Sequence, residues 1–551
     1  MSFKTNENQQ ISMEDSLKGL SERELKILKG SWAEDFANFI FPNIPEAPFS
    51  VLFSEKSRSK PNVPINIILG LFMLKEQFDL TDEELMEQML FNIQFQYALH
   101  TTSCFEQPIN DNTLRRFRNR IAEYEAATGI DLVKEAFNTL KEKTAEIMGM
   151  NATVRRVDSL MISAGCRKLS RLSIMGETLR LAAREIGRSG NATPLTGKYY
   201  EENGSGSKDI GYRLKRGEVA PKMEEMLRDA MEILDAYPEE LAGSETHAAL
   251  KRMIEDQSKE DGEGGRTLKE GKEISPESMQ TPHDPGATYR NKGGKGNVGY
   301  VANVDEACDG DKRLINGYDL QQNTYSDAKF AEDMIETVPE GSGKQTIVFD
   351  GAYASTELLE KAEEKNVEIA TTSLIGGMDG TFVAGFKFDG EGNISECPAG
   401  HSPMDAKHGN GFHQAHFDAA TCENCHHCGI CPGVFQAKAA LIKFSDKALA
   451  KAQYEQKTET EKFRELAKLR NGIDGVQSVL RRKYGIDRVR DKGAVRKRHR
   501  LGFVMMAINA GRLIKWRKNT AKTRGLLSVF CFFYNLRRKN CSSYRCDFVS
   551  V

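Results

Sequence analysis

Residues 346–353, with the sequence TIVFDGAY, are the most informative part of the chain. The apolar run from Thr346 to Phe349 has the length and composition of a buried strand. Asp350 stands at the end of that run, and Gly351 directly after it allows a tight turn. A carboxylate at the tip of a buried strand is a position where a metal ion can be bound.

Two further acidic residues have a comparable setting. Asp158 closes the strand-like run of residues 153–157, and Asp474 lies in the basic, helical stretch of residues 470–474. Three carboxylates in separate elements, the last of them among positive charges, are typical of two-metal phosphoryl transfer on a nucleic acid. The pattern therefore predicts that Asp158, Asp350 and Asp474 are catalytic.

Charge is distributed unevenly along the 551 residues. The whole chain has a net charge of -2, with 28% charged and 39% hydrophobic residues, as in a globular protein. Residues 464–524, however, contain 19 Lys and Arg but only 4 Asp and Glu. A charge run is usually a solvated helix face, but an excess this large favours a polyanionic partner.

Apolar segments and the start of the chain bear on its location. The longest apolar run, around residues 67–74, is far shorter than the roughly 20 residues that span a bilayer. The polar start MSFKTNENQQ lacks the apolar core of a signal peptide. We therefore expect a cytoplasmic protein that does not bind a membrane.

Strand and helix signals predict a mixed α/β sheet that carries helices. Strand signals fall at residues 153–157, 297–304, 313–319, 347–349 and 367–371, and a helix is expected at 355–365. A long helix through Asp474 is expected later in the chain. Residues 255–285 are charged, Gly-rich and low in hydrophobics, so they are predicted to form a linker or mobile loop.

Five regions follow from these signals. They are a helical N-terminal region (1–147), the first part of the core with a helical insertion and linker at about 167–285 (148–374), a Cys-rich insertion (375–455), the last part of the core with the basic helix (456–524), and a tail of atypical composition (525–551).

The N-terminal region contains a helix with a strongly basic face. Asp111 or Asn112 can cap this helix, and it carries Arg115, Arg116 and Arg118. Short helices that end in an Arg-rich one suit a helix-turn-helix-like DNA-binding module. An ordinary helical bundle with a basic surface is the alternative.

Five of the 11 cysteines fall within one short segment, with six histidines nearby. They are Cys397, Cys422, Cys425, Cys428 and Cys431. In a reducing compartment such clustering indicates metal binding rather than disulfides. The Cys-x2-Cys pairs suit a structural zinc site, for which Cys397 with Cys422, Cys425 and Cys431 is an alternative ligand set. Reduced thiols without metal remain possible, as does an iron–sulfur cluster, although that motif has three residues before its last Cys and this chain has two.

Several linked stretches together resemble one protein family. They are Arg155 to Ser159, Ser278 to Tyr289 leading into Lys292, Lys295 and Gly299-Tyr300, Phe349 to Tyr353, and Arg470-x3-Asp474-x6-Arg481. In this order they resemble a bacterial insertion-sequence transposase of the DDE type, over most of residues 40–516. The resemblance implies a ribonuclease-H-like catalytic core behind a helical N-terminal transposase domain. Related transposases carry a similar Cys-rich insertion before the third acid.

The resemblance also implies an activity and its partners. It implies phosphodiester cleavage and strand transfer at insertion-sequence ends with Mg²⁺ or Mn²⁺, by a homodimer on double-stranded DNA at the nucleoid. Asp158 would bridge both ions, while Asp350 and Asp474 would each hold one. The side chains expected to contact phosphates near the transposon end are Arg470, Arg481, Arg482 and Lys483.

The third acid departs from the family pattern Tyr-x2-Arg-x3-Glu-x6-Lys. This chain has Ala467, Arg470, Asp474 and Arg481 at those positions, and Glu465 is a fallback ligand. Asp is one methylene shorter than Glu, and catalysis tolerates little misplacement. A decayed or repurposed DNA-binding protein of the same fold is therefore the alternative, and an iron–sulfur redox protein is a more distant one.

Overall fold

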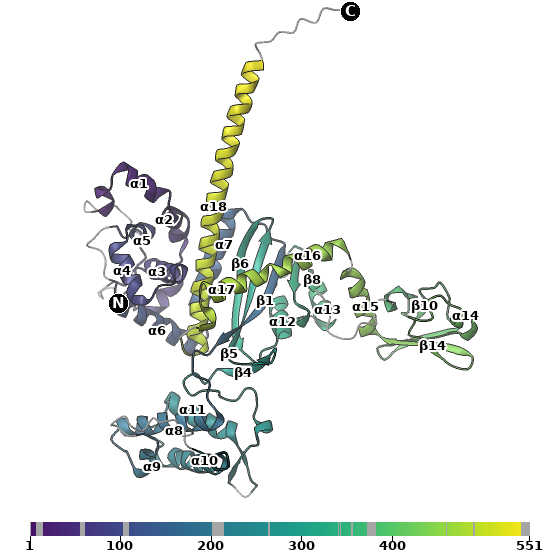
Figure 1. Cartoon of the computed structure of the whole chain (residues 1–551), viewed down its shortest axis with the longest axis horizontal. Helices are drawn as coiled ribbons and strands as arrows, with labels where there is room; N and C mark the ends of the chain where they lie inside the picture. Colours follow the sequence, from purple (N-terminus) through teal and green to yellow (C-terminus); the bar gives the residue numbers. More distant parts are fainter. Residues whose placement is uncertain are drawn as a thin grey trace, which may run out of the picture.

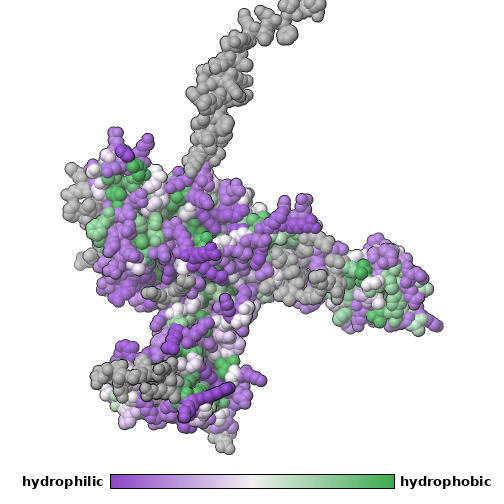
Figure 2. Space-filling view, viewed as in Figure 1, coloured by the Kyte–Doolittle hydropathy of each residue, from purple (hydrophilic) through white to green (hydrophobic). Residues whose placement is uncertain are grey.

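A computed structural model describes residues 2–6, 15–54, 61–102, 109–200, 214–262, 265–339, 341, 343–353, 356–371, 382–458, 460–488 and 491–541. Figure 1 shows a central sheet beside a group of N-terminal helices, with one long helix standing between them. A helical lobe and a smaller β-rich lobe project from this centre. Hydrophilic residues cover most of the face shown in Figure 2.

The N-terminal region is helical, as predicted. Its α-helices are α1 (Glu22–Lys29), α2 (Trp32–Asp35), α3 (Ile65–Phe78), α4 (Asp82–Phe91), α5 (Ile93–Ala98), α6 (Asp111–Thr128) and α7 (Leu132–Met148). Thr81 and Glu84 form a reciprocal capping box at the start of α4. The basic helix α6 is capped by Asn110, one residue before the predicted caps, because its side chain accepts from Thr113 N at 2.9 Å.

The central sheet is mixed, which confirms the predicted fold class. Its strands follow the order β4-β5-β1-β7-β8, with β6 paired to β5. They are β1 (Val154–Ser163), β4 (Thr288–Lys292), β5 (Lys295–Asp309), β6 (Lys312–Gln322), β7 (Gln345–Phe349) and β8 (Val367–Thr371). β7 runs parallel to both β1 and β8, and β4, β5 and β6 form the antiparallel side. Helices α12 (Asp327–Glu336) and α13 (Thr356–Glu364) flank β7 in sequence.

The first strand is longer than its sequence signal. β1 pairs with β5 from Val154 through to Ser163, so Asp158 lies within the strand and does not close it. Gly299 on β5 makes the far end of this pairing possible. It has φ +148°, and a Cβ there would lie 2.1 Å from Ile162 O.

The described residues between 167 and 285 form a helical lobe with its own apolar core. Its helices are α8 (Arg171–Arg188), α9 (Pro194–Gly197), α10 (Val219–Ala236) and α11 (Glu245–Gln257). The linker expected at 255–285 is instead packed. It contains β2 (Ser258–Glu260) and β3 (Arg266–Leu268), and the buried Asp284 accepts a hydrogen bond from Tyr300 of β5.

The Cys-rich insertion is a separate small β unit at the right of Figure 1. Its elements are β9 (Lys387–Phe388), β10 (Ile394–Glu396), β11 (Asp405–Gly409), β12 (Phe412–Asp418), α14 (Ala419–Glu423), β13 (Val434–Phe435) and β14 (Ala439–Ser445). Helices α15 (Asp446–Thr458), α16 (Glu461–Asn471) and α17 (Ile473–Arg482) lead from it back to the sheet.

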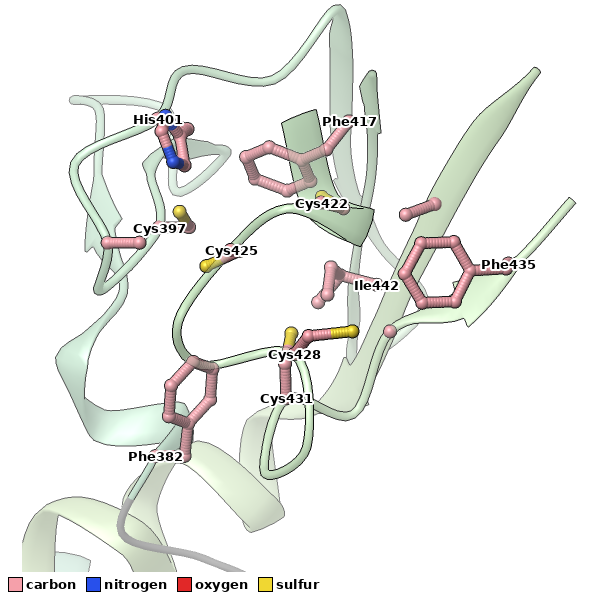
Figure 3. Close-up of a pocket in the computed structure, with 13 residues that line it drawn as sticks. Phe382, Cys397, His401, Phe417, Cys422, Cys425, Cys428, Cys431, Phe435 and Ile442 are labelled. Carbon is pink, nitrogen blue, oxygen red and sulfur yellow. The ribbon is translucent and has the colours of Figure 1, made fainter. Parts of the chain in front are cut away.

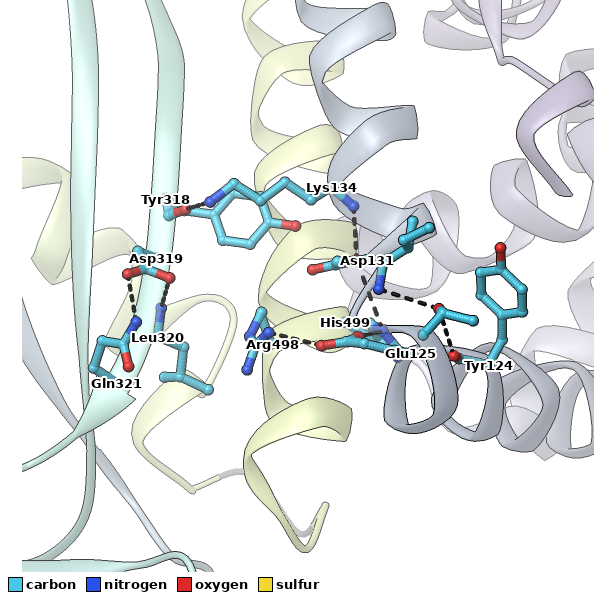
Figure 4. Close-up of polar contacts among 12 residues, drawn as sticks. Tyr124, Glu125, Asp131, Lys134, Tyr318, Asp319, Leu320, Gln321, Arg498 and His499 are labelled. Carbon is cyan, nitrogen blue, oxygen red and sulfur yellow. Dashed lines mark hydrogen bonds and ion pairs between the residues drawn. The ribbon is translucent and has the colours of Figure 1, made fainter. Parts of the chain in front are cut away.

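The last helix, α18 (Ala494–Cys541), joins the N-terminal helices to the sheet. His499 Nε2 lies 2.5 Å from Glu125 Oε2, and Arg498 donates to the same carboxylate at 2.7 Å (Figure 4). Lys134 of α7 donates to Tyr318 O on β6 at 2.8 Å. The sheet and the N-terminal helices therefore share a polar, buried junction around Glu125.

The tail that the sequence sets apart at residue 525 begins inside α18, and residues 542–551 lie outside the described residues. Among the helices that the structure describes, none combines the length and the apolar composition needed to cross a membrane.

Candidate active site

Asp158 and Asp350 come from adjacent parallel strands. The last registered pair between β1 and β7 joins Arg156 to Val348. Side chains two residues apart on a strand point to the same face. Asp158 and Asp350 each lie two residues beyond that pair, so they occupy neighbouring positions where the two strands separate.

Arg470 of α16 links these two acids. Its Nη2 lies 3.3 Å from Asp350 Oδ2 and 3.9 Å from Asp158 Oδ2. Within the described residues, the buried Nε of Arg470 has no hydrogen-bond partner. The guanidinium therefore neutralises part of the negative charge that Asp158 and Asp350 bring together.

The expected long helix through Asp474 is interrupted at Gly472. α16 ends at Asn471 and α17 begins at Ile473. Arg156 of β1 causes the close packing at this point, because its Nη1 donates to Leu469 O at 2.7 Å. A Cβ on Gly472 would lie 2.0 Å from Arg156 Nη1. This contact holds the junction between the two helices against Arg156, which precedes Asp158 by two residues on β1.

Asp474 lies in the first turn of α17 and is exposed. Gln477, three residues further along the same helix face, donates to Ser159 O at 2.9 Å. Asp474 is also close enough to Asp158 for its charge to raise the pKa of that acid. Asp158 and Asp350 therefore lie beside the same guanidinium, and Asp474 approaches Asp158 from the start of α17.

Burial dominates the electrostatics of Asp158. It raises the pKa of Asp158 to about 6, and the charge of Asp474 adds to this shift. Ser159 N, which donates to Asp158 Oδ1 at 2.8 Å, acts in the opposite direction, as do the cations of Arg470 and Lys292. The charged form of Asp158 is therefore costly in the protein alone, and a nearby cation would stabilise it.

The raised pKa of Asp158 predicts how the stability of the fold depends on pH in EDTA. The folded state keeps the Asp158 proton up to a pH of about 6, whereas the unfolded chain loses it near the ordinary value of 3.8. This proton therefore stabilises the fold at low pH, and the stabilisation is lost as the pH rises through the folded pKa. Asp158→Asn stays neutral, so it should exceed the parent in stability by about 2–3 kcal/mol near pH 8.

Denaturant unfolding of both proteins between pH 4 and about pH 8 measures this difference. The Asn side chain keeps an acceptor for Ser159 N, so the comparison isolates the charge. A parent and a variant that change in parallel across this range would show that Asp158 titrates normally.

Several residues that the sequence analysis did not single out lie around Asp158 and Asp350. Ser159 Oγ donates to Asp327 Oδ1 at 2.9 Å, and Asp327 stands in the first turn of α12. Tyr353 donates to Asn303 Oδ1 at 3.1 Å. Burial raises the pKa of Tyr353, and the charges of Asp327, Asp158 and Asp350 raise it further. No pattern in the sequence marks Asp327, since an acid after a Ser cap is common at helix starts.

The predicted DNA-binding residues of α6 divide into two kinds. Arg115 and Arg116 are exposed. Arg118 instead forms an ion pair with Asp82 of α4, and its guanidinium lies 5.3 Å from the centre of the Phe72 ring. The charge of Arg118 is therefore already paired within the N-terminal region.

The second basic group lies at the end of α17. Arg481 and Arg482 are exposed in its last turn. Lys483 follows them, with Nζ 4.8 Å from the centre of the Tyr484 ring. Partial burial lowers the pKa of Lys483. These side chains lie about two to two and a half helical turns after Asp474.

The five clustered cysteines line a single small cavity in the insertion (Figure 3). Burial raises the pKa of Cys422, and the thiols of Cys431, Cys397 and Cys425 raise it further. The backbone N–H of His427 donates to Cys425 Sγ at 3.4 Å. The cavity thus brings together sulfur ligands that lie more than 30 residues apart in sequence.

Three protein-family models match the chain. The model described as "Transposase domain (DUF772)" matches residues 27–120. Two models described as "Transposase DDE domain" match residues 276–373 and residues 396–514. Together they cover more than half of the chain, including Asp350 and Asp474, while Asp158 lies between matched segments.

A solved structure, "Cryo-EM structure of piggyBac transposase synaptic complex with hairpin DNA (SNHP)", is 8% identical with a TM-score of 0.32, over 93% of this chain and 77% of that chain. The search of curated proteins gives no match.

The matched segments follow the order of the structure. The helical N-terminal region comes first, then the sheet with Asp350, and then the insertion with the helices that carry Asp474. The sheet is accordingly a ribonuclease-H-like core, and the chain belongs to the insertion-sequence transposases of the DDE type.

Proposed function

We propose that this transposase cleaves DNA at the ends of its insertion sequence and joins the liberated 3'-ends to target DNA, at a site formed by Asp158, Asp350 and Asp474. The observation that carries the proposal is the position of Arg470, whose guanidinium lies within 4 Å of both Asp158 and Asp350. Side chains of opposite charge from three elements meet there, at the edge where β1 and β7 separate.

The donor atoms fit Mg²⁺ or Mn²⁺. All three side chains offer carboxylate oxygens, the hard ligands that Mg²⁺ prefers. Asp158 is buried with a raised pKa, so a divalent cation would offset the cost of its charge. Bound ions of this kind activate the attacking oxygen and stabilise the charge on the leaving 3'-oxygen.

The protein side chains have separate roles in this proposal. Asp158 would contact both ions, while Asp350 and Asp474 would each contact one. Arg470 holds Asp158 and Asp350 together in the absence of metal and is near enough to contact a phosphate when they bind the ions. The hydroxyl of Ser159 and the carboxylate of Asp327 fix β1 against α12 beside the site.

DNA binding would use the two exposed basic groups. Arg481 and Arg482 end the helix that carries Asp474, and Lys483 caps it, so phosphates bound there would lie at the C-terminal end of the third acid's helix. Arg115 and Arg116 on α6 would contact the transposon end further away. Binding as a homodimer, with one chain at each end of the element, remains part of the proposal.

A catalytically decayed DNA-binding protein is the second candidate. It is favoured by the short third acid, Asp474, and by the small side chain of Ala467, which replaces a polar residue of the family pattern. The fold and the basic groups serve DNA binding in either case, so only an assay of the chemistry separates the two candidates.

Cleavage of a duplex that contains the element's own end and flanking DNA tests the proposal. We expect strand cleavage in Mg²⁺ and none in EDTA, with DNA binding in both conditions. Binding without cleavage in Mg²⁺ or Mn²⁺ would support the decayed protein instead.

The cysteine cavity would hold a structural zinc ion, separate from the acids. Its thiols are the soft ligands that zinc prefers, and five of them line the same cavity. Replacing Cys425 and Cys428 by Ser should remove one zinc ion per chain and lower the thermal stability of the insertion, because structural zinc contributes directly to folding.

Metal analysis of protein purified without chelator measures this loss. Cys166→Ser is the matched control, since Cys166 is also half-buried but lies outside the insertion. Zinc content equal to that of the parent in the double variant would refute the assignment. A brown protein that absorbs visible light would indicate an iron–sulfur cluster in its place.

A further inference from the structure

A second cluster of possible metal ligands lies in the insertion, apart from the cysteine cavity. It consists of His408 on β11, His413 on β12 and Asp446 at the start of α15. One ligand atom from each residue lies within 4.8 Å of the others. None of these three residues lines the cysteine cavity.

Local sequence explains why the two histidines face each other. Asn410 and Gly411 have φ values of 53° and 76°, as a two-residue turn between antiparallel strands requires. The turn places His408 and His413 directly opposite each other on β11 and β12, where side chains share one face of the sheet. Their rings stack with centres 4.3 Å apart and an angle of 16° between planes.

Asp446 is brought to the same place by the next strand. β14 pairs with β12 up to Ser445, which lies opposite Phe412. Asp446 follows directly, and its N–H donates to Gly411 O in the turn at 3.0 Å. The carboxylate therefore reaches the ends of both imidazole rings.

Both histidines direct the same nitrogen at this carboxylate. His408 Nε2 lies 3.0 Å from Asp446 Oδ1, and His413 Nε2 lies 2.9 Å from the same oxygen. The other nitrogen of His413, Nδ1, lies 2.9 Å from Gly392 O. A carbonyl oxygen only accepts, so Nδ1 carries a proton and donates it.

This hydrogen bond fixes what Nε2 can do. In a neutral His413 the proton on Nδ1 leaves a lone pair on Nε2, and this lone pair faces the lone pairs of Asp446. Two acceptors at 2.9 Å repel each other, so a cation must lie between them. The cation is either a second proton on His413 or a metal ion.

We propose that His408 Nε2, His413 Nε2 and the Asp446 carboxylate bind a zinc ion. Two imidazoles and one carboxylate are a common zinc ligand set, which leaves a further position for water. A backbone carbonyl on the far nitrogen of a ligating histidine is the usual outer contact that orients such a ring. His413 has that contact in Gly392, and Phe388 and Phe444 pack beside its ring at 4.7 and 5.4 Å.

The position of the site indicates its role. The ion joins β11, β12 and the first turn of α15. α15 is the helix that leads out of the insertion towards α16, which carries Arg470. The zinc would therefore fix the direction in which the insertion leaves the catalytic core, without contact to the acids.

Zinc content of the full-length chain tests the site. Protein is loaded with excess Zn²⁺ near pH 7.5, freed of unbound metal and analysed for zinc per chain. We expect His408→Ala and Asp446→Asn each to hold one zinc ion fewer than the parent. Loss of a ligand should weaken binding by more than the roughly 10–100-fold that loss of an outer contact costs.

His416→Ala is the matched control. His416 lies on the same strand as His413 and pairs with Asp405 at 2.6 Å, but no second histidine shares that carboxylate in the described residues. This variant should hold as much zinc as the parent. The same zinc measurements are repeated on proteins that also carry Cys425→Ser and Cys428→Ser. In these proteins, His408→Ala must still remove one zinc ion.

Two outcomes would overturn the proposal. Unchanged zinc content in both His408→Ala and Asp446→Asn would mean that a proton, not a metal, lies between His413 and Asp446. A loss that disappears in the cysteine background would mean that the missing ion came from the cysteine cavity. His408 is about one-third exposed, so its replacement by Ala should leave the fold intact, which circular dichroism in EDTA checks.

Discussion

Asp350→Asn is expected to lower DNA cleavage by at least on the order of 10³-fold, because a carboxylate that holds a catalytic ion supports several kcal/mol of transition-state stabilisation. In the parent, Asp350 Oδ1 accepts a hydrogen bond from Gly351 N at 2.7 Å. The Asn side chain has the same shape and can still accept this hydrogen bond. What the variant loses is the charge beside Arg470. Cleavage of end DNA in Mg²⁺ under single-turnover conditions measures the effect.

The same variant should bind DNA nearly as well as the parent, since binding rests on basic side chains outside the site. Asp309→Asn is the matched control, because Asp309 ends a strand of the same sheet, where it accepts from Asn151 N at 3.1 Å. It should cleave at the parent rate. A parent-like rate for Asp350→Asn would rule out the proposed active site.

Asp474→Glu is expected to raise the rate of cleavage by up to about 10²-fold if the carboxylate of Asp474 is a metal ligand that is only displaced from the position of the family's Glu. The added methylene moves the carboxylate by about 1.5 Å, and misplacement on this scale can cost about 10²-fold. Asp474 is exposed at the start of α17, so the longer side chain has room. The contact from Gln477 to Ser159 O holds this helix against β1 while residue 474 changes.

Asp474→Ala completes the comparison in the same Mg²⁺ assay. If Asp474 is a ligand, Ala should abolish cleavage whether or not Glu improves it. A Glu variant slower than the parent would mean that the backbone at Gly472 already places Asp474 correctly. An Ala variant as fast as the parent would exclude Asp474 and direct attention to Glu465 on α16.

The sequence predicted the sheet well because its strands carry strong local signals. The apolar run before Asp350 and the helix and strand after it fold as β7, α13 and β8, close to their expected bounds. Asp158 was misplaced at a strand end because the strand signal was followed only to Val157. The apolar residues Leu160 to Ile162 come after it, and β1 continues to pair with β5 as far as Ser163.

Other differences arise from contacts distant in sequence. The helix through Asp474 is broken because Arg156, more than 300 residues earlier, packs on Gly472. Residues 255–285 look like a linker by composition, but Asp284 among them is buried against Tyr300. Arg118 looks available for DNA until Asp82 of α4 is seen beside it. Local composition cannot anticipate such partners.

The histidine and aspartate cluster was missed for a different reason. Its signal was present, since an Asn-Gly turn flanked by two histidines is a recognisable hairpin pattern. The third member, Asp446, lies more than 30 residues further on, and only the pairing of β12 with β14 brings it to the turn. The nearby cysteines also offered a simpler account of metal binding in this region.

Binding of Mn²⁺ shows directly whether Asp158, Asp350 and Asp474 hold divalent cations. Electron paramagnetic resonance on zinc-saturated protein with end DNA counts the bound ions. The parent and Asp309→Asn should bind two Mn²⁺ per chain, as in a two-metal site. Asp158→Asn should bind neither ion tightly, and Asp350→Asn should bind fewer than the parent. Equal Mn²⁺ binding by all four proteins would contradict the proposed site.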